Sequence, residues 1–254
     1  MPHVGEEFIK GSGKDFRLAL LLLWEYNIGM KKVIYHGSDH AVAVPVWGGG
    51  HIHNDYGQGF YCTENLSMAK EWSVSEDHNG YANKYMIDMD GLSVLNLSSG
   101  EYTVLEWLTI LLENRTFDDY TMLIRDAKQY LRENFSLPYN DYDIIIGYRA
   151  DDSYFSFAAD FVSGVIPYRV LNSAMKLGKL GEQFVLKSRR SFDSLEFTGI
   201  EEARCDEWYP KKAFRLRAAR REYFESEKNR RVKGDIYISR ILEEEMKRDD
   251  PRLR

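Results

Sequence analysis

The chain has few cysteines and only short apolar runs, and both features limit what it can be. Cys62 and Cys205 stand far apart, and neither belongs to a Cys-x-x-Cys or Cys/His cluster. A reducing, cytoplasmic compartment is the simplest setting for such a chain. The apolar run at residues 18–24 covers about a third of the ~20 residues that span a bilayer, and it lacks the basic start and cleavage site of a signal peptide. We therefore expect no membrane partner.

The sequence also lacks the spacings of a metal centre or a P-loop. His51 and His53 follow three glycines, but no matching carboxylate or cysteine cluster stands at ligand spacing, so we expect no metal. The glycines are not followed by Gly-Lys-Ser/Thr, which excludes a P-loop. A net charge of -6 argues against wholesale attraction to nucleic acid or anionic lipid, although a local patch remains able to bind either.

The remaining composition is that of a folded domain, with 44% hydrophobic residues, 17 Tyr and 13 Phe. Strand patterns occur at residues 32–35, 59–63, 81–89, 93–97, 142–148 and 184–187. Helix patterns occur at residues 16–26, 67–75, 103–114, 121–133, 153–162 and 168–177. Because the strands alternate irregularly with the helices, without a β-α-β rhythm, they predict an α+β fold with mostly antiparallel sheets.

Three segments follow from these patterns: an N-terminal helical segment (1–30), a central domain (31–199) and a charged helical extension (200–254). Residues 211–233 carry ten basic side chains against three glutamates, a local charge of +7. Arginines share a predicted helix there with Phe214, Leu216, Tyr223 and Phe224. This pattern suits a phosphate, an RNA backbone or an acidic partner, and equally suits a solvated helix that packs its apolar residues on the domain.

Two short runs carry the strongest functional signal. The first is Val-Ile-Tyr-His-Gly-Ser at residues 33–38, and the second is Asp-Tyr-Gly-Gln-Gly-Phe-Tyr-Cys-Thr at residues 55–63, followed by the amphipathic stretch Ser67–Trp72. A polar side chain that ends an apolar strand, a glycine-hinged aromatic turn and a short helix can together hold a flat ring, a ribose and a diphosphate. The two runs therefore predict a nucleotide pocket.

These runs resemble the pattern by which ADP-ribosyltransferases of the His-Tyr-Glu type hold NAD. With Trp107, Asn114-Arg115, residues 142–152 and residues 182–186, the resemblance extends in order over residues 32–197 to a bacterial domain-of-unknown-function family in that clan. It implies split antiparallel sheets with flanking helices, here with a C-terminal helical extension, and NAD as substrate.

The resemblance assigns roles to residues of both runs. His36 and Gly37, followed by Ser38, would position NAD through a ribose hydroxyl and the nicotinamide amide. Tyr61 and Trp72 would clamp the nicotinamide, with Trp72 in place of the usual tyrosine. The alternative is an ordinary buried histidine and ordinary core aromatic residues.

The catalytic carboxylate does not match the family pattern. Gln183 stands where most transferases place glutamate, with Glu182 just before it, and adjacent strand residues point to opposite faces. A glutamine can hold a ribose hydroxyl but cannot take a proton. Asp152, with Asp151, is a substitute acid or else a helix N-cap. Asp55 is a further candidate.

Arg115 is expected either to hold the diphosphate by a forked contact or to form a surface ion pair. The function that the resemblance implies is NAD-dependent mono-ADP-ribosyl transfer to a protein or nucleic acid, as the toxin of a bacterial toxin–antitoxin pair or as an anti-phage effector. An antitoxin protein is then a partner. The alternatives are an NAD glycohydrolase and a catalytically degenerate NAD-binding module.

Overall fold

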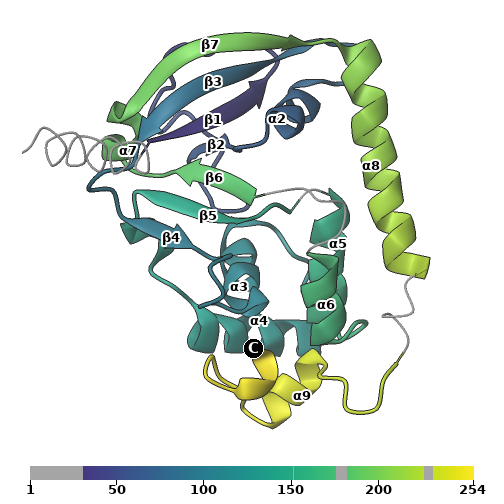
Figure 1. Ribbon diagram of the computed structural model, residues 1–254. Coiled ribbons are helices and arrows are strands. Elements are labelled where there is room, and N and C mark those ends of the chain that lie inside the picture. The colour runs from purple at the N-terminus through teal and green to yellow at the C-terminus, as the bar shows by residue number, and fades with distance from the viewer. Residues whose placement is uncertain (1–30, 151, 176–181, 226–230) are drawn as a thin grey trace, which may run out of the picture.

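The computed structural model describes residues 31–150, 152–175, 182–225 and 231–254, so the helix expected at residues 16–26 lies outside the described chain. A three-stranded sheet lies over a four-stranded sheet, and helices cover the far face of the second sheet (Figure 1). The α+β class predicted from the sequence is confirmed. The helix α8 runs along one side of these layers, and α9 and the C-terminus lie beneath the helical layer.

The strands, in chain order, are β1 (Lys31–Ser38), β2 (Phe60–Cys62), β3 (Gly80–Asp88), β4 (Val94–Asn96), β5 (Ile144–Tyr148), β6 (Glu182–Leu186) and β7 (Leu195–Ala203). The helices are α2 (Leu66–Ser73), α3 (Val104–Asn114), α4 (Met122–Phe135), α5 (Asp152–Val162), α6 (Tyr168–Ala174), α7 (Arg189–Asp193), α8 (Cys205–Glu225) and α9 (Ile238–Glu243). Two 3-10 turns, η1 (Tyr139–Asp141) and η4 (Pro251–Leu253), complete the described elements.

The first sheet is antiparallel, with strand order β1-β3-β7. Its edge strand β7 is almost wholly exposed and carries Glu196, Glu201 and Glu202, charges that discourage pairing with another chain. The sequence patterns did not predict β7, because these acidic residues and Gly199 interrupt the strand signal. The expected boundary between residues 199 and 200 lies inside this strand.

The second sheet is mixed, with strand order β2-β6-β5-β4. Its β2–β6 and β5–β6 pairs are antiparallel, but β4 and β5 are parallel. The prediction of mostly antiparallel sheets therefore holds for every strand pair of the described residues except this one. A parallel pair needs a crossover connection, and the chain supplies one as α3 and α4 between the two strands.

The two sheets meet where β1 passes β2. The backbones of Tyr35 and Thr63 exchange two hydrogen bonds there, of 2.8 and 2.9 Å. Behind this bridge the facing sides of the sheets share a core that includes Ile34, Cys62 and Ile146. Burial raises the pKa of the Cys62 thiol, which marks this cysteine as a core residue. The bridge fixes the relative position of His36, one residue after Tyr35, and Tyr61, two residues before Thr63.

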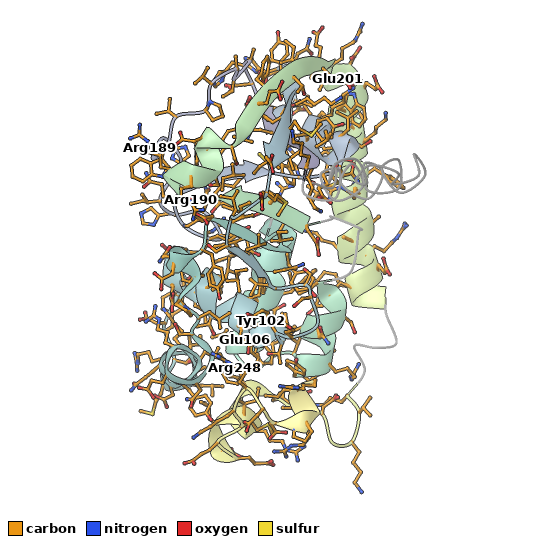
Figure 2. All side chains as sticks on the ribbon, turned by 60° about the vertical axis from the view of Figure 1, so that its left-hand side comes forward. Tyr102, Glu106, Arg189, Arg190, Glu201 and Arg248 are labelled. Carbon is orange, nitrogen blue, oxygen red and sulfur yellow. The ribbon has the colours of Figure 1, made fainter. Side chains whose placement is uncertain are left out.

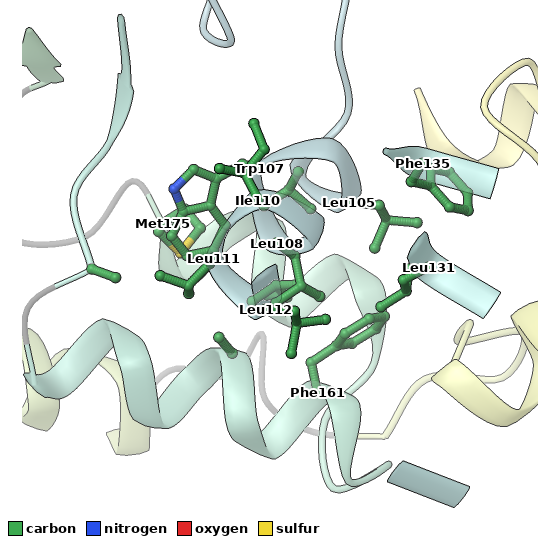
Figure 3. Packing of buried hydrophobic residues seen from close by; sticks show 14 of the residues in the cluster. Leu105, Trp107, Leu108, Ile110, Leu111, Leu112, Leu131, Phe135, Phe161 and Met175 are labelled. Atoms are coloured by element: carbon green, nitrogen blue, oxygen red, sulfur yellow. The ribbon is translucent and has the colours of Figure 1, made fainter. Parts of the chain in front are cut away.

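The larger core lies between the second sheet and the helices, around α3 (Figure 3). Trp107, Leu108 and Leu111 are at most 1% exposed, because α3 is covered on several sides. A capping box starts this helix: Thr103 caps it and the carboxylate of Glu106 returns to the Thr103 N–H at 2.9 Å. The fully buried Glu106 also pairs with Arg248, 3.1 Å away, which ties the C-terminal segment to α3 (Figure 2).

The helix α8 packs against α2 and α5. Arg215 of α8 lies 2.7 Å from the buried carboxylate of Glu71 on α2, and Tyr223 stacks on Phe157 of α5 with ring centroids 3.9 Å apart. Phe214 and Phe224 stay 66% and 76% exposed. Arg215 and Tyr223 thus anchor the predicted basic helix to the domain, while Phe214 and Phe224 face solvent. None of the described helices is long and apolar enough to span a bilayer.

Candidate functional site

A cavity of about 710 Å³ lies at the junction of the two sheets. It collects residues that are far apart in the chain, and five of the predicted site residues line it: His36, Tyr61, Trp72, Arg115 and Gln183. They come from β1, β2, α2, the residue that caps α3, and β6. The size is within the range of about 300–1,000 Å³ that small-molecule sites occupy.

His36 has a fixed tautomer. Its Nδ1 lies 2.7 Å from the Tyr61 carbonyl oxygen, which can only accept, so Nδ1 carries the proton and Nε2 is an acceptor while the ring is neutral. The ring stacks on Phe60 with centroids 4.3 Å apart. Burial lowers the pKa of His36, although the bond to Tyr61 opposes this effect. His36 therefore presents a neutral imidazole to the cavity.

Tyr61 presents its ring, because its hydroxyl group is already bonded within the turn before it. The hydroxyl donates to the Gly57 carbonyl at 2.6 Å and accepts from the Tyr56 N–H at 3.0 Å. Gly57 has a positive φ of 72°, which a glycine adopts without strain. Lys187 also holds this turn, since its Nζ donates to the carbonyls of Tyr56 and Gln58 at 2.6 and 2.8 Å.

Trp72 lies on α2 with one face against Arg149, whose guanidinium carbon is 4.5 Å from the ring centroid. Its indole Nε1 is buried and has no hydrogen-bond partner among the described residues. Arg149, which also lines the cavity, directly follows β5. The sequence patterns did not single it out, although its place at the end of a buried strand was a usable signal.

The buried acid of the cavity is Asp55, which is 4% exposed. Its Oδ1 accepts from Arg115 at 3.1 Å, and its Oδ2 accepts from the Ala150 N–H at 2.9 Å and from Gln183 Nε2 at 3.2 Å. Burial raises the pKa of Asp55, while the Ala150 bond and the charges of Arg115 and Arg149 limit the rise. Arg115 thus forms an ion pair, which was one of the two predictions from the sequence, but its partner Asp55 is buried in the cavity wall and not on the surface.

Gln183 is 5% exposed, and its Oε1 is buried without a hydrogen-bond partner among the described residues. Glu182, the preceding residue on β6, is exposed and does not line the cavity. The strand therefore turns the amide inward and the acid outward. Asp152 begins α5, but its side chain, like residue 151, lies outside the described part of the structure.

Gly37 and Ser38 do not line the cavity. Gly37 allows β1 to approach α2, because a Cβ there would lie 2.1 Å from the Ala69 carbonyl oxygen. The Ser38 hydroxyl donates to the His40 carbonyl at 2.6 Å and accepts from Asn83 Nδ2 at 2.9 Å. In this structure both residues shape the backbone around His36.

The rim of the cavity is the loop at residues 39–59, which the structure ties down at several points. The Val42 N–H donates to Asn83 at 2.7 Å, Trp47 Nε1 donates to the Lys187 carbonyl at 3.2 Å, and Gln58 Nε2 donates to the Gly48 carbonyl at 2.6 Å. Val44 and Val46 line the rim and are 82% and 73% exposed. An apolar rim of this kind is typical of a surface that meets another molecule.

The side chains that line the cavity determine which groups it can bind. In residues 31–150, 152–175, 182–225 and 231–254 no group of three or more His, Cys, Asp or Glu side chains lies close enough together to hold a metal ion. The residues that line the cavity include two arginines, the neutral imidazole of His36 and the aromatic rings of Phe60, Tyr61 and Trp72. The indole Nε1 of Trp72 and the amide Oε1 of Gln183 have no hydrogen-bond partner among the described residues. These groups match a ligand with flat rings, hydroxyl groups and negative charge.

In a comparison with protein families, residues 32–197 match a model described as "Protein of unknown function (DUF3990)". No curated protein and no solved structure matches the chain. The matched region runs from β1 into β7, so it contains every residue that lines the cavity. Because the match covers more than half of the 254 residues, the chain belongs to the DUF3990 family of proteins of unknown function.

Proposed function

We propose that this protein is an NAD-dependent mono-ADP-ribosyltransferase that modifies a macromolecule. The observation that carries the proposal is the common cavity of His36, Tyr61, Trp72, Arg115 and Gln183. These residues belong to the sequence pattern that resembles NAD-binding transferases. Convergence of residues from five separate elements on one cavity supports a shared ligand.

The reaction breaks the bond between the nicotinamide nitrogen and the ribose C1′, and the electron pair leaves with nicotinamide. Positive charge develops on the sugar, so the site must orient the ribose and hold the ring that departs. In this proposal the neutral His36 offers Nε2 to a ribose hydroxyl, and the nicotinamide binds beside the rings of Tyr61 and Trp72, which both line the cavity. Arg115 and Arg149 supply positive charge for the diphosphate.

The acceptor in this proposal is a macromolecule, because the cavity opens beneath an exposed apolar rim. Val44 and Val46 present this rim to solvent, and water as an acceptor would need no such surface. The nucleophile of the acceptor bonds to C1′ and loses its proton to solvent. An effector that modifies macromolecules also endangers its own cell, so the proposal includes an antitoxin protein as partner.

The test is an incubation of the purified protein with NAD labelled in its adenosine half, together with a cell lysate. We expect released nicotinamide by chromatography and label on protein or nucleic acid. Trp72→Leu removes the flat ring beside Arg149 while keeping an apolar side chain, and should lower nicotinamide release by about 10- to 100-fold. Trp208→Leu is the matched control, because Trp208 contacts Lys70 and Lys211 at the α2–α8 boundary, outside the cavity.

Each outcome decides between named alternatives. Labelled macromolecule that disappears in Trp72→Leu and persists in Trp208→Leu supports the transferase. Free ADP-ribose without labelled macromolecule assigns the cavity to an NAD glycohydrolase. NAD affinity in calorimetry without nicotinamide release assigns it to a binding module, and neither affinity nor release overturns the proposal.

A further inference from the structure

The cavity wall contains a buried carboxylate with a fixed set of partners. Asp55 is the residue before Tyr56, whose ring is fully buried and whose hydroxyl donates to the Tyr148 carbonyl at 2.7 Å. This anchor holds the Asp55 carboxylate between Arg115 on one oxygen and the Ala150 N–H and Gln183 on the other. Asp55 is thus positioned by the core and not by the flexible end of a surface loop.

The contact with Asp55 also determines which way the Gln183 amide points. An ionised carboxylate can only accept, so the amide nitrogen must be the atom 3.2 Å from Asp55 Oδ2. Oε1 is then directed away from Asp55. It is buried and lacks a hydrogen-bond partner among the described residues, on a side chain that is 5% exposed and lines the cavity.

A buried acceptor without a donor costs roughly 1–3 kcal/mol, so such an atom in a cavity is a sign that a ligand donates to it. NAD offers three kinds of neutral donor, namely its ribose hydroxyls, the nicotinamide amide and the adenine amino group. Of these, a hydroxyl of the nicotinamide ribose adjoins the carbon on which positive charge develops, so a negative charge behind Gln183 stabilises the transition state most when a hydroxyl is the donor. An acceptor whose own N–H group donates to a negative charge is also strengthened, since linked hydrogen bonds polarise one another. The Asp55 charge therefore makes Gln183 Oε1 a better acceptor than an isolated amide.

We propose that Asp55 and Gln183 form one unit that binds the nicotinamide ribose, in which Gln183 Oε1 accepts from a ribose hydroxyl and Asp55 is the positioning residue behind it. This inference rests on the proposed function. The unit explains how a chain with glutamine at the carboxylate position stabilises a cationic sugar. The negative charge is on Asp55, which is linked to the sugar through the Gln183 amide. As positive charge grows on the ribose and nicotinamide leaves with the bonding pair, the hydroxyl donates more strongly to Oε1.

Other charged groups around the unit are compatible with this role. Arg115 contacts Asp55 on Oδ1, away from the amide, and the charge of Arg149 lowers the pKa of Asp55. Glu182 is exposed on the other side of β6. Among the described residues that line the cavity, Asp55 is the one carboxylate.

The experiment measures kcat and KM for nicotinamide release, and NAD affinity by calorimetry. It compares four proteins: wild type, Asp55→Asn, Gln183→Glu and the double variant Asp55→Asn/Gln183→Glu. Asp55→Asn should lower kcat by about 100-fold and leave the affinity within about threefold, because the charge is used mainly in the transition state. The double variant moves the charge onto the inner position and should recover kcat to within about tenfold of wild type. Gln183→Glu alone places two carboxylates in contact and should move the acid limb of the pH profile to higher pH.

Two further variants separate this role from a loss of folding. Asp143 is equally buried, at 5% exposed, but binds Ser93 and Ser188 outside the cavity, so Asp143→Asn should leave kcat per folded molecule unchanged. Gln183→Met keeps the Arg115 and Ala150 contacts of Asp55, removes only the amide, and should lower kcat by about 10- to 100-fold.

Two results would overturn the Asp55–Gln183 unit while the transferase stands: an unchanged kcat in Asp55→Asn or Gln183→Met, or a folded double variant whose kcat does not recover. A wild-type protein that neither binds NAD nor releases nicotinamide overturns both proposals.

Discussion

His36 is informative because one contact determines both of its ring nitrogens. The bond from Nδ1 to the Tyr61 carbonyl fixes the tautomer, and burial keeps the ring neutral near pH 7 by lowering its pKa. A satisfied core histidine and a functional histidine are usually alternatives. Here the same side chain is satisfied on one nitrogen and lines the cavity, so the two roles coexist.

His36→Asn separates the two nitrogens. An asparagine amide can reproduce the donor of Nδ1 toward Tyr61 but offers nothing at the position of Nε2. We expect nicotinamide release to fall by about 10- to 100-fold, the value of one lost hydrogen bond in a dry site. The matched control is His78→Asn, since His78 is exposed and pairs with Asp77. Equal activity of the two variants would exclude a role for Nε2.

The same residue sets a pH dependence of stability. With a folded-state pKa below the ordinary 6.5, the folded protein binds fewer protons than the unfolded chain in the interval between the two values. The stability that neutral His36 contributes is present above pH 6.5 and is lost as the pH falls through that interval. Wild type should therefore lose stability relative to His36→Asn below pH 6.5, by at most about 1.4 kcal/mol per pH unit, in urea denaturation. A constant difference would contradict the shift.

The sequence pointed to side chains whose type and neighbours suggested one chemistry, and their roles stay predictions. His36, Tyr61 and Trp72 were chosen in this way and line the cavity. Arg149 did not stand out, since its one signal is its place directly after the buried strand β5, and no neighbouring residue points to the same chemistry. The Asp55–Gln183 contact joins residues 128 positions apart, and no spacing rule reaches that far.

At the scale of elements, the approach of α2 to β1 sets the shape of the cavity. Gly37 makes the approach possible, and α2 carries Trp72 into the cavity wall. The sequence predicted both elements, with boundaries that differ by a few residues. It did not predict their contact, because the role of Gly37 there depends on the Ala69 backbone, which is distant in the chain.

Gly37→Ala should separate β1 from α2. Its Cβ would meet the Ala69 carbonyl oxygen, a backbone atom that cannot rotate away, so the helix must shift and Trp72 with it. We expect a destabilisation of roughly 1–3 kcal/mol and weaker NAD binding, measured by urea denaturation and calorimetry. Ser38→Ala, one residue on, should leave NAD affinity largely intact. Unchanged stability of Gly37→Ala would show that β1 and α2 can accommodate a Cβ at this position.

The sheet elements illustrate the limit of local patterns. The parallel pairing of β4 with β5 depends on α3 and α4 as a crossover, a topological fact that strand patterns do not contain. The strand β7 exists because β3 offers it a pairing edge, despite its glutamates. Local propensity therefore predicted where strands begin and end better than which neighbours they take.

At the scale of the molecule, α8 joins the first sheet to the helical layer along one side (Figure 1). Its basic residues have divided roles: Arg215 pairs with the buried Glu71 next to Trp72, and Arg217 is exposed. The charge pattern alone could not assign these roles, because the helix face that meets α2 depends on the fold.

Arg215→Ala should therefore destabilise the protein, whereas Arg217→Ala should not. Removal of Arg215 leaves the Glu71 carboxylate buried without its cation, at a cost of about 3–5 kcal/mol. The exposed Arg217 should contribute within about 0.5 kcal/mol. Urea denaturation of both variants measures the difference. Equal stabilities would show that α8 is held by its apolar contacts alone.

The central claim is that the cavity between β1, α2 and β6 binds NAD through its nicotinamide ribose. A crystal structure of the protein with NAD tests it most directly. We predict a ribose hydroxyl about 3 Å from Gln183 Oε1, and the nicotinamide ring beside Trp72 and Tyr61. NAD bound elsewhere, or bound here with its ribose away from Gln183, would contradict the account.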